Sequence, residues 1–102
     1  MDEITCCQYE EFVKALADET RQDILELLQD REMSVGEIAA CFRQTQPTIS
    51  HHLGLLRRAR VVLARREGKQ VYYTANRCCL DACTRRLVEQ LTGEGNEPCE
   101  KS

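Results

Sequence analysis

The sequence predicts a mostly α-helical domain with one small β-hairpin, and two observations lead to this fold class. Apolar residues recur at helical spacing through residues 6–30, 34–60 and 76–91. The stretch VVLARREGKQVYYTA, residues 61–75, is rich in β-branched and aromatic residues around Glu67-Gly68, which is typical of a two-stranded hairpin. Four helices, a hairpin and a last helix, in that order, make a winged helix-turn-helix (ααααββα).

The chain has 102 residues, which is the size of one domain. We expect residues 1–92 to form this domain and residues 93–102 to be a flexible C-terminal tail. A domain of this size buries roughly two-thirds of its unfolded surface, so a partner subunit would add stability. No apolar run approaches the ~20 residues that span a bilayer, and the acidic N-terminus does not read as an export signal.

The first three helices are indicated by apolar spacing and by capping residues. We expect helices at about 6–17 and 20–30, with Asp18 as a cap between them. Ser34 and Glu37 form a capping-box pattern that begins a short third helix, over residues 34–42. We expect the apolar side chains of this helix to face inward; they are Ile38, Ala39 and Phe42.

The fourth helix is expected from about Gln46 to Arg60, with Pro47 in its first turn, where proline is tolerated. At ~100° per residue, Ile49, Leu53 and Leu56 share one stripe and face the core. The opposite side is polar, small and partly cationic, and it carries Pro47, Ser50, His51, Gly54 and Arg58.

Charge is unevenly distributed along the chain. The net charge is −3, yet residues 43–77 contain eight basic residues and Glu67 as their one acid, which gives +7. A basic stretch in an acidic protein indicates a local surface for a polyanion, and a helix-turn-helix places its second helix in the major groove of DNA. The residues expected at or near base edges are Gln46, Thr48, Ser50 and His51. Those expected to contact phosphates are Arg57, Arg58, Arg65, Arg66 and Lys69.

Simpler interpretations of these side chains exist. His51 and His52 are adjacent, so on a helix they point about 100° apart, which argues against a chelating pair. His52 lies toward the core side and is expected to be a packed histidine. The arginines near the end of the helix could form an ordinary solvated face, but the basic hairpin beside them favours DNA.

The last helix is expected from Asn76 or Arg77 to about Leu91, with an apolar stripe made by Leu80, Leu87, Val88 and Leu91. A domain this small has little interior left to cover that stripe, so we expect a partner helix there and a homodimer. Two-fold symmetry then predicts double-stranded operator DNA with a palindromic site, its half-sites about one helical turn apart.

Three segments together resemble the ArsR/SmtB family of bacterial metal-responsive repressors: FVKALADETRQDILELL, QPTISHHLGLLRRARVV and RREGKQVYY. The resemblance covers about residues 9–91. It implies a homodimeric winged-helix repressor that dimerises through its first and last helices and whose operator binding is weakened by metal. Two family metal sites are missing, because Ser34-Val35-Gly36 replaces a C-V-C pattern and the last helix lacks the usual carboxylate and histidine ligands. Zinc sensing of that kind is therefore disfavoured.

The chain has seven cysteines, an odd number, so we expect a cytoplasmic protein with mostly reduced thiols. Cys78, Cys79 and Cys83 begin the last helix, where the helix N-terminus and Arg77 favour thiolates, which bind soft ions. The resemblance makes As(III) or Sb(III) the first choice of inducer, with Cd(II), Pb(II) and Hg(II) as alternatives. No organic cofactor is expected.

Other cysteines offer a second site or none. Cys6 and Cys7, at the start of the first helix, form a second candidate set, either alone or across the dimer. Cys41 is expected to be a small buried residue, and Cys99, in the tail, to be incidental.

Three other functions compete with metal-dependent repression. The nearest is a redox or persulfide sensor of the same fold, in which a cysteine of the last helix oxidises. A constitutive DNA-binding protein would ignore thiophilic ions. An enzyme is excluded, because the sequence has no C-x-x-C motif and both histidines lie on the expected DNA helix.

Overall fold

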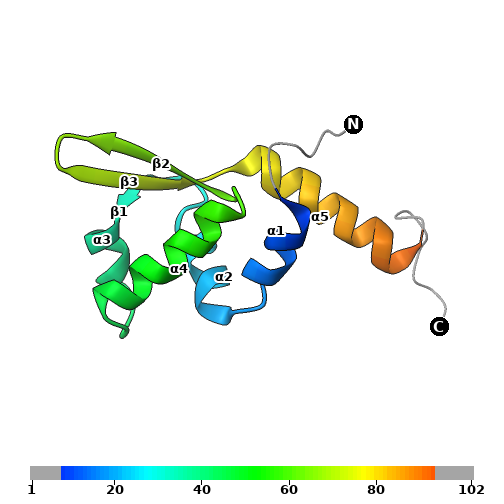
Figure 1. The fold of residues 1–102 in the computed structure, drawn as a ribbon, viewed down its shortest axis with the longest axis horizontal. Helices are drawn as coiled ribbons and strands as arrows, with labels where there is room; N and C mark the ends of the chain where they lie inside the picture. Colours follow the sequence, from blue (N-terminus) through cyan, green and yellow to red (C-terminus); the bar gives the residue numbers. More distant parts are fainter. Residues whose placement is uncertain (1–7, 94–102) are drawn as a thin grey trace.

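The computed structural model describes residues 8–93 and contains the expected winged helix-turn-helix, mostly helical with a small antiparallel sheet (Figure 1). The helices and the hairpin follow one another as predicted, and one short strand is added. In chain order the elements are α1 (Tyr9–Ala15), α2 (Glu19–Leu27), β1 (Met33–Ser34), α3 (Val35–Ala39), α4 (Gln46–Arg58), β2 (Val62–Glu67), β3 (Gln70–Ala75) and α5 (Arg77–Thr92).

Local capping explains where two of the early helices begin. The Asp18 side chain accepts the backbone N–H of Arg21 at the start of α2, as the sequence predicted. At α3 the capping box is complete: Ser34 accepts the N–H of Glu37, and the Glu37 carboxylate accepts the N–H of Ser34. Helix α3 is shorter than predicted, because the N–H of Cys41 bonds three residues back and tightens the last turn.

The sheet has three strands in the order β1-β3-β2. β2 and β3 form the predicted hairpin, paired from Val62 with Ala75 to Glu67 with Gln70, and Gly68 has the positive φ of 63° that its tight turn requires. Strand β1 was not predicted, because two residues are too few to show alternation. It joins the hairpin to the body of the domain through Met33, which lies opposite Tyr73.

The core lies between the helices and the base of the hairpin. The predicted stripe of α4 is buried, and Ile49, Leu53 and Leu56 are no more than 1% exposed. Ile38 of α3 is fully buried, and Phe42 packs against the core while partly exposed. The other fully buried large side chains among the described residues are Phe12, Ile24, Leu28, Val61, Val62, Cys79 and Cys83.

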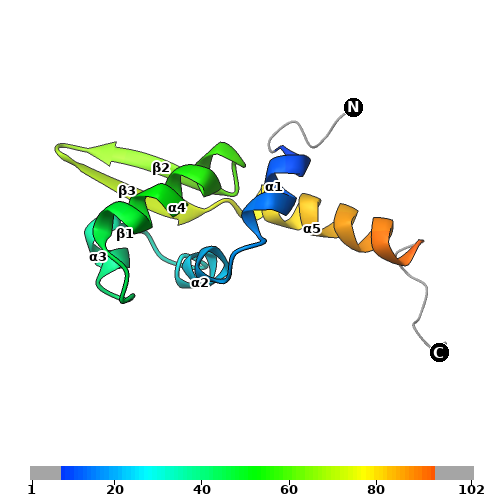
Figure 2. The ribbon, with the colours of Figure 1, turned by 60° about the horizontal axis from the view of Figure 1, so that its bottom comes forward.

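Helix α5 leaves the base of the hairpin and extends away from it, with α1 alongside (Figures 1 and 2). The hairpin therefore projects at one end and α5 at the other, with α4 between them. None of the described helices is both long enough and apolar enough to cross a membrane.

Candidate nucleic-acid interface and cysteine sites

The N-terminal half of α4 presents polar side chains to solvent. Thr45 caps the helix by accepting the N–H of Thr48, and its hydroxyl oxygen also lies 3.0 Å from that of Thr48. The capped N-terminus and the buried Ile49 fix which side of the helix faces outward. All four residues expected near base edges are exposed; they are Gln46, Thr48, Ser50 and His51.

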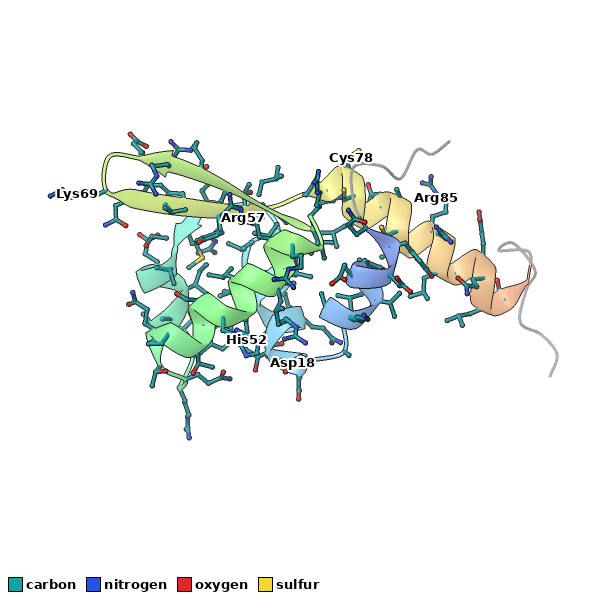
Figure 3. All side chains as sticks on the ribbon, viewed as in Figure 1. Asp18, His52, Arg57, Lys69, Cys78 and Arg85 are labelled. Carbon is teal, nitrogen blue, oxygen red and sulfur yellow. The ribbon has the colours of Figure 1, made fainter. Side chains whose placement is uncertain are left out.

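His52 is turned inward, as predicted for a packed histidine, and is 9% exposed. A guanidinium nitrogen of Arg21 lies 3.2 Å from its Nδ1 atom, and Figure 3 shows His52 close to Asp18. The rings of His51 and His52 are tilted, with their centroids 6.2 Å apart. The two histidines therefore occupy different environments.

Arg65, on β2, is held by two carboxylates. Nε and Nη2 donate to the two oxygens of Glu32 at 2.8 and 2.9 Å, and Nη1 donates to Glu67 at 2.8 Å. The guanidinium also lies 5.2 Å from the centre of the Tyr72 ring. The hydrogen bond from Arg65 holds the pKa of Glu32 below its ordinary value of 4.5. Arg65 thus braces the hairpin against the loop before β1.

The other two basic residues of the hairpin have no such partners. Arg66 and Lys69 are exposed, and neither forms an ion pair with another residue between 8 and 93. Lys69 lies at the tip of the hairpin, at the far end from α5 (Figure 3). Both positive charges are therefore open to an external anion.

Three exposed arginines surround the C-terminal end of α4: Arg57, Arg58 and Arg60. Within the described chain none of them forms an ion pair. Together with Gln8 and Gly54 they line an open hollow of about 490 Å³. This hollow connects the start of α1 with the exposed side of α4.

Arg60 ends α4 in a left-handed conformation, with φ of 67°, and is the one non-glycine residue with a positive φ in residues 8–93. The N–H of Val61 bonds to the carbonyl of Leu56, and the N–H of Arg60 to that of Arg57, which is the Schellman pattern. Glycine usually occupies this place, because an L-residue costs about 1–2 kcal/mol there. The side chain of Asn76 donates to the carbonyl of Arg60 at 2.8 Å and holds the turn.

Gly54 is a second locally unfavourable residue of α4. Glycine inside a helix is about 0.5–1 kcal/mol less stable than alanine. A Cβ atom at Gly54 would meet no atom within 4 Å, so the packing of this domain does not require glycine there.

The cysteines of α5 are divided between core and solvent. Cys79 and Cys83 are fully buried, whereas Cys78 is exposed at the start of the helix (Figure 3). Cys83 takes part in a disulfide bond, which differs from the expectation of reduced thiols. Among residues 8–93, no group of three or more Cys, His, Asp or Glu side chains is arranged to hold a metal ion.

The remaining cysteines lie elsewhere. The prediction that Cys41 is buried is wrong: it is exposed just after α3, and its thiol donates to the carbonyl of Glu37 at 3.6 Å. Cys6, Cys7 and Cys99 lie outside the described residues.

Helices α1 and α5 are joined by side chains and expose apolar residues. The Tyr9 hydroxyl donates to Gln90 at 3.0 Å, and the Arg86 guanidinium lies 4.1 Å from the centre of the Tyr9 ring. Three of the four exposed large hydrophobic residues in the described part of the chain lie on these two helices: Val13 on α1, and Val88 and Leu91 on α5. Leu91 is 75% exposed, so this apolar surface is not covered within the described part of one chain.

The roles of Arg21, Glu32 and Arg60 were not foreseen. Arg21 contacts His52 and Glu32 contacts Arg65, in each case more than 30 positions away, and no local sequence pattern predicts such pairs. A signal for Arg60 did exist, since a helix that ends in RRARVV has no glycine for its C-terminal turn.

Comparisons with known proteins agree with this architecture. Residues 18–63 match the family model described as "Bacterial regulatory protein, arsR family". The chain is 44% identical over 85 residues to the transcriptional activator HlyU of Vibrio cholerae, covering 83% of this chain and 78% of the relative. It is 44% identical over 63 residues to the transcriptional repressor SdpR of Bacillus subtilis, covering 62% and 70%.

Two further matches cover most of the chain. The arsenical resistance operon repressor of Staphylococcus aureus is 34% identical over 92 residues, which is 85% of this chain and 82% of the relative. A solved structure, the ArsR-like transcriptional regulator from Rhodococcus sp. RHA1, has a TM-score of 0.72 at 26% identity. The similarity spans 83% of this chain and 79% of that one.

Proposed function

Since this chain belongs to the arsR family of bacterial regulatory proteins, we propose that it is a homodimeric repressor that leaves its operator when cysteine thiolates bind a soft metal or metalloid ion. Family members are DNA-binding transcriptional regulators, so the chain is a regulator of transcription and not an enzyme. We also propose that it acts in the cytoplasm, where a bacterial regulator meets its operator DNA. As(III) or Sb(III) is the proposed inducer, in line with the arsenical resistance repressor among its relatives.

In the proposed complex, α4 lies in the major groove with its N-terminal half toward the bases. Short polar side chains let the backbone of α4 come close, and they can donate to or accept from base edges. The proposed base-reading residues are Gln46, Thr48, Ser50 and His51. The proposed phosphate contacts are Arg57, Arg58, Arg66 and Lys69. Arg65 is also proposed, but here phosphate oxygens must compete with Glu32 and Glu67.

The proposed dimer joins α1 and α5 of two subunits. The exposed Val13, Val88 and Leu91 support this, because removing their remaining apolar surface from water would stabilise the dimer. A two-fold axis at this surface presents two copies of α4 to one face of DNA. The operator is therefore expected to be a palindrome, with half-sites about one helical turn apart.

One observation carries the proposed response: α5 holds both the buried cysteines, Cys79 and Cys83, and exposed apolar side chains. Chemistry at Cys79 or Cys83 changes how α5 packs on the core, and α5 is also the proposed subunit contact. Movement of α5 then rotates the two copies of α4 out of register with the DNA. Coupling of this kind is usually worth ~1–3 kcal/mol, a 5- to 150-fold change in operator affinity.

The cysteines limit how an ion can be held. Because Cys79 and Cys83 face the core and Cys78 faces solvent, one ion cannot meet all three while the first turn of α5 keeps its present shape. Binding through Cys78, Cys79 and Cys83 therefore requires local rearrangement and prior reduction of the disulfide at Cys83. The second candidate set, Cys6 and Cys7, could supply thiolates instead. Either route releases protons, so induction should strengthen as the pH rises.

A thiol-based redox or persulfide sensor is the second candidate, and the disulfide at Cys83 is the observation that favours it. In this alternative, operator affinity depends on the oxidation state of the α5 cysteine rather than on an ion. Operator binding and dimerisation are the same in both cases.

The two candidates separate under strictly reducing, anaerobic conditions. The operator is first selected from a random duplex library, and its release is then followed by fluorescence anisotropy. Release by stoichiometric arsenite or antimonite supports the ion-responsive repressor. Release by a thiol oxidant or a persulfide alone supports the second candidate and contradicts the first.

Variants locate the responding thiols. Cys79→Ala with Cys83→Ala should keep operator binding and lose induction. Cys78→Ala tests the same part of α5 without opening the core, since its side chain is exposed. Cys41→Ala, an exposed cysteine far from α5 in sequence, is the matched control and should respond as wild type. If induction survives all the α5 variants, Cys6 and Cys7 become the leading site.

A further inference from the structure

The exposed side of α4 carries two residues that lower the stability of the domain. Gly54 weakens the helix although no neighbour needs the space, and Arg60 occupies a left-handed turn that glycine fits better. Both line the same hollow, with Gln8, Arg57 and Arg58. Residues kept against local stability at one place indicate a functional requirement there.

The electrostatics of the hollow define what it can bind. Three arginines line it, and none forms an ion pair with a carboxylate in residues 8–93. Interaction with the negative end of the α4 dipole explains basic residues in the last helical turn, such as Arg57 and Arg58. It does not explain Arg60, which stands beyond the helix at a cost in backbone strain. An external anion explains all three.

The position of the hollow identifies the anion. At ~100° per residue, Gly54, Arg57 and Arg58 lie on the same side of α4 as Ser50 and His51, the proposed base-reading residues. A helix seated in the major groove has a DNA backbone along its flank, and arginine binds phosphate oxygens in a bidentate manner. Without a side chain at Gly54, that backbone can approach α4 closely.

We propose that the hollow lined by Gln8, Gly54, Arg57, Arg58 and Arg60 binds a backbone phosphate of the operator, with Arg60 as an additional phosphate ligand. This inference rests on the proposed DNA-binding function and extends it to a residue outside the helix-turn-helix pattern. Asn76 contributes by holding the Arg60 turn, through its bond to the Arg60 carbonyl at 2.8 Å.

The central test is Arg60→Gly, because glycine suits a φ of 67° and the variant should fold at least as well as wild type. Its Tm should rise by about 4–8 °C. The slope of log affinity against log salt should become shallower by about one, for the operator and for random duplex alike. Arg60→Lys keeps the charge and should restore the wild-type slope.

The control is Arg85→Ala, which removes one exposed positive charge from α5 (Figure 3) and should keep the wild-type slope. A wild-type slope for Arg60→Gly overturns the inference. A loss of affinity for the operator alone, with random duplex unaffected, also overturns it, because Arg60 would then contact a base. Binding of inorganic phosphate to wild type and to Arg60→Gly is measured as well. If Arg60→Gly loses phosphate binding but keeps the wild-type slope for DNA, the hollow binds a free anion and the inference is overturned. If wild type itself binds no duplex, the proposed function fails as well.

Gly54→Ala tests the close approach separately. The variant should have a higher Tm and weaker binding to both DNAs at every salt concentration, with the slope unchanged, because a methyl group moves the backbone away without removing charge. Unchanged affinity for both DNAs would show that DNA does not come close to Gly54, and this part of the inference would be wrong.

Discussion

The guanidinium of Arg21 lies 3.2 Å from Nδ1 of His52 and joins α2 to the inner side of α4. A guanidinium has donors only, so Nδ1 of His52 is the acceptor in this contact. Nε of Arg21 also donates to the carbonyl of Ala15 at 2.8 Å, and the Arg21 backbone N–H donates to Asp18. One arginine therefore connects the end of α1, the cap of α2 and the helix proposed to read DNA.

Replacing Arg21 with methionine should lower the free energy of unfolding by about 2–3 kcal/mol. The estimate reflects a buried imidazole nitrogen and the Ala15 carbonyl left without their donor. Urea denaturation followed by circular dichroism measures the change. Arg31→Met, at an exposed position, is the control and should change stability by less than about 0.5 kcal/mol. Equal effects in both variants would show that the contact of Arg21 with His52 contributes nothing specific.

Ser50→Ala and His51→Ala should each weaken operator binding by about 1–3 kcal/mol while hardly affecting random duplex. Both side chains are exposed on α4, and contacts to base edges discriminate between sequences. Anisotropy titrations with the selected operator and a scrambled duplex measure the difference. An equal loss on both duplexes would contradict the assignment of this helix face to base reading.

Leu91→Glu should convert a dimer into a monomer that still folds. Leu91 is 75% exposed on α5, so a carboxylate there leaves the core of one chain intact but opposes burial against a partner. Analytical ultracentrifugation over a range of concentrations measures association. Arg85→Glu is the control for added negative charge on α5. A dimer that survives Leu91→Glu would exclude the end of α5 from the subunit contact.

Glu32→Gln should loosen the hairpin at neutral pH and have no effect in acid. The pKa of Glu32 is lowered in the folded protein by its hydrogen bond with Arg65. Its contribution is therefore present above the ordinary value of 4.5 and is lost as the pH falls through the lower folded pKa. Amide hydrogen exchange of β2 and β3, measured at pH 6 and in acid, reports the difference. Glu26→Gln, on α2, is the control, and an effect independent of pH would contradict the role of the Glu32 charge.

The sequence predicts local features of this fold well and distant contacts poorly. The capping box of Ser34 and Glu37 and the buried stripe of α4 follow from spacings of three or four residues, and the structure has both. The brace from Arg65 to Glu32 joins positions 33 residues apart and requires the folded hairpin. Cys41 illustrates the other limit, because burial was expected from the residue type alone, and the structure places it exposed just after α3.

Strand β2 lies at the outer edge of the sheet, with a neighbour on one side only. The unpaired backbone groups of such an edge can pair with a strand of another molecule. Leu63, which is 49% exposed, adds an apolar side chain that favours this association. The edge also carries charged side chains, which oppose such strand pairing: Arg65, Arg66 and Glu67. Neutralising these arginines to test DNA binding would also remove a safeguard against aggregation, so light scattering must accompany every such measurement.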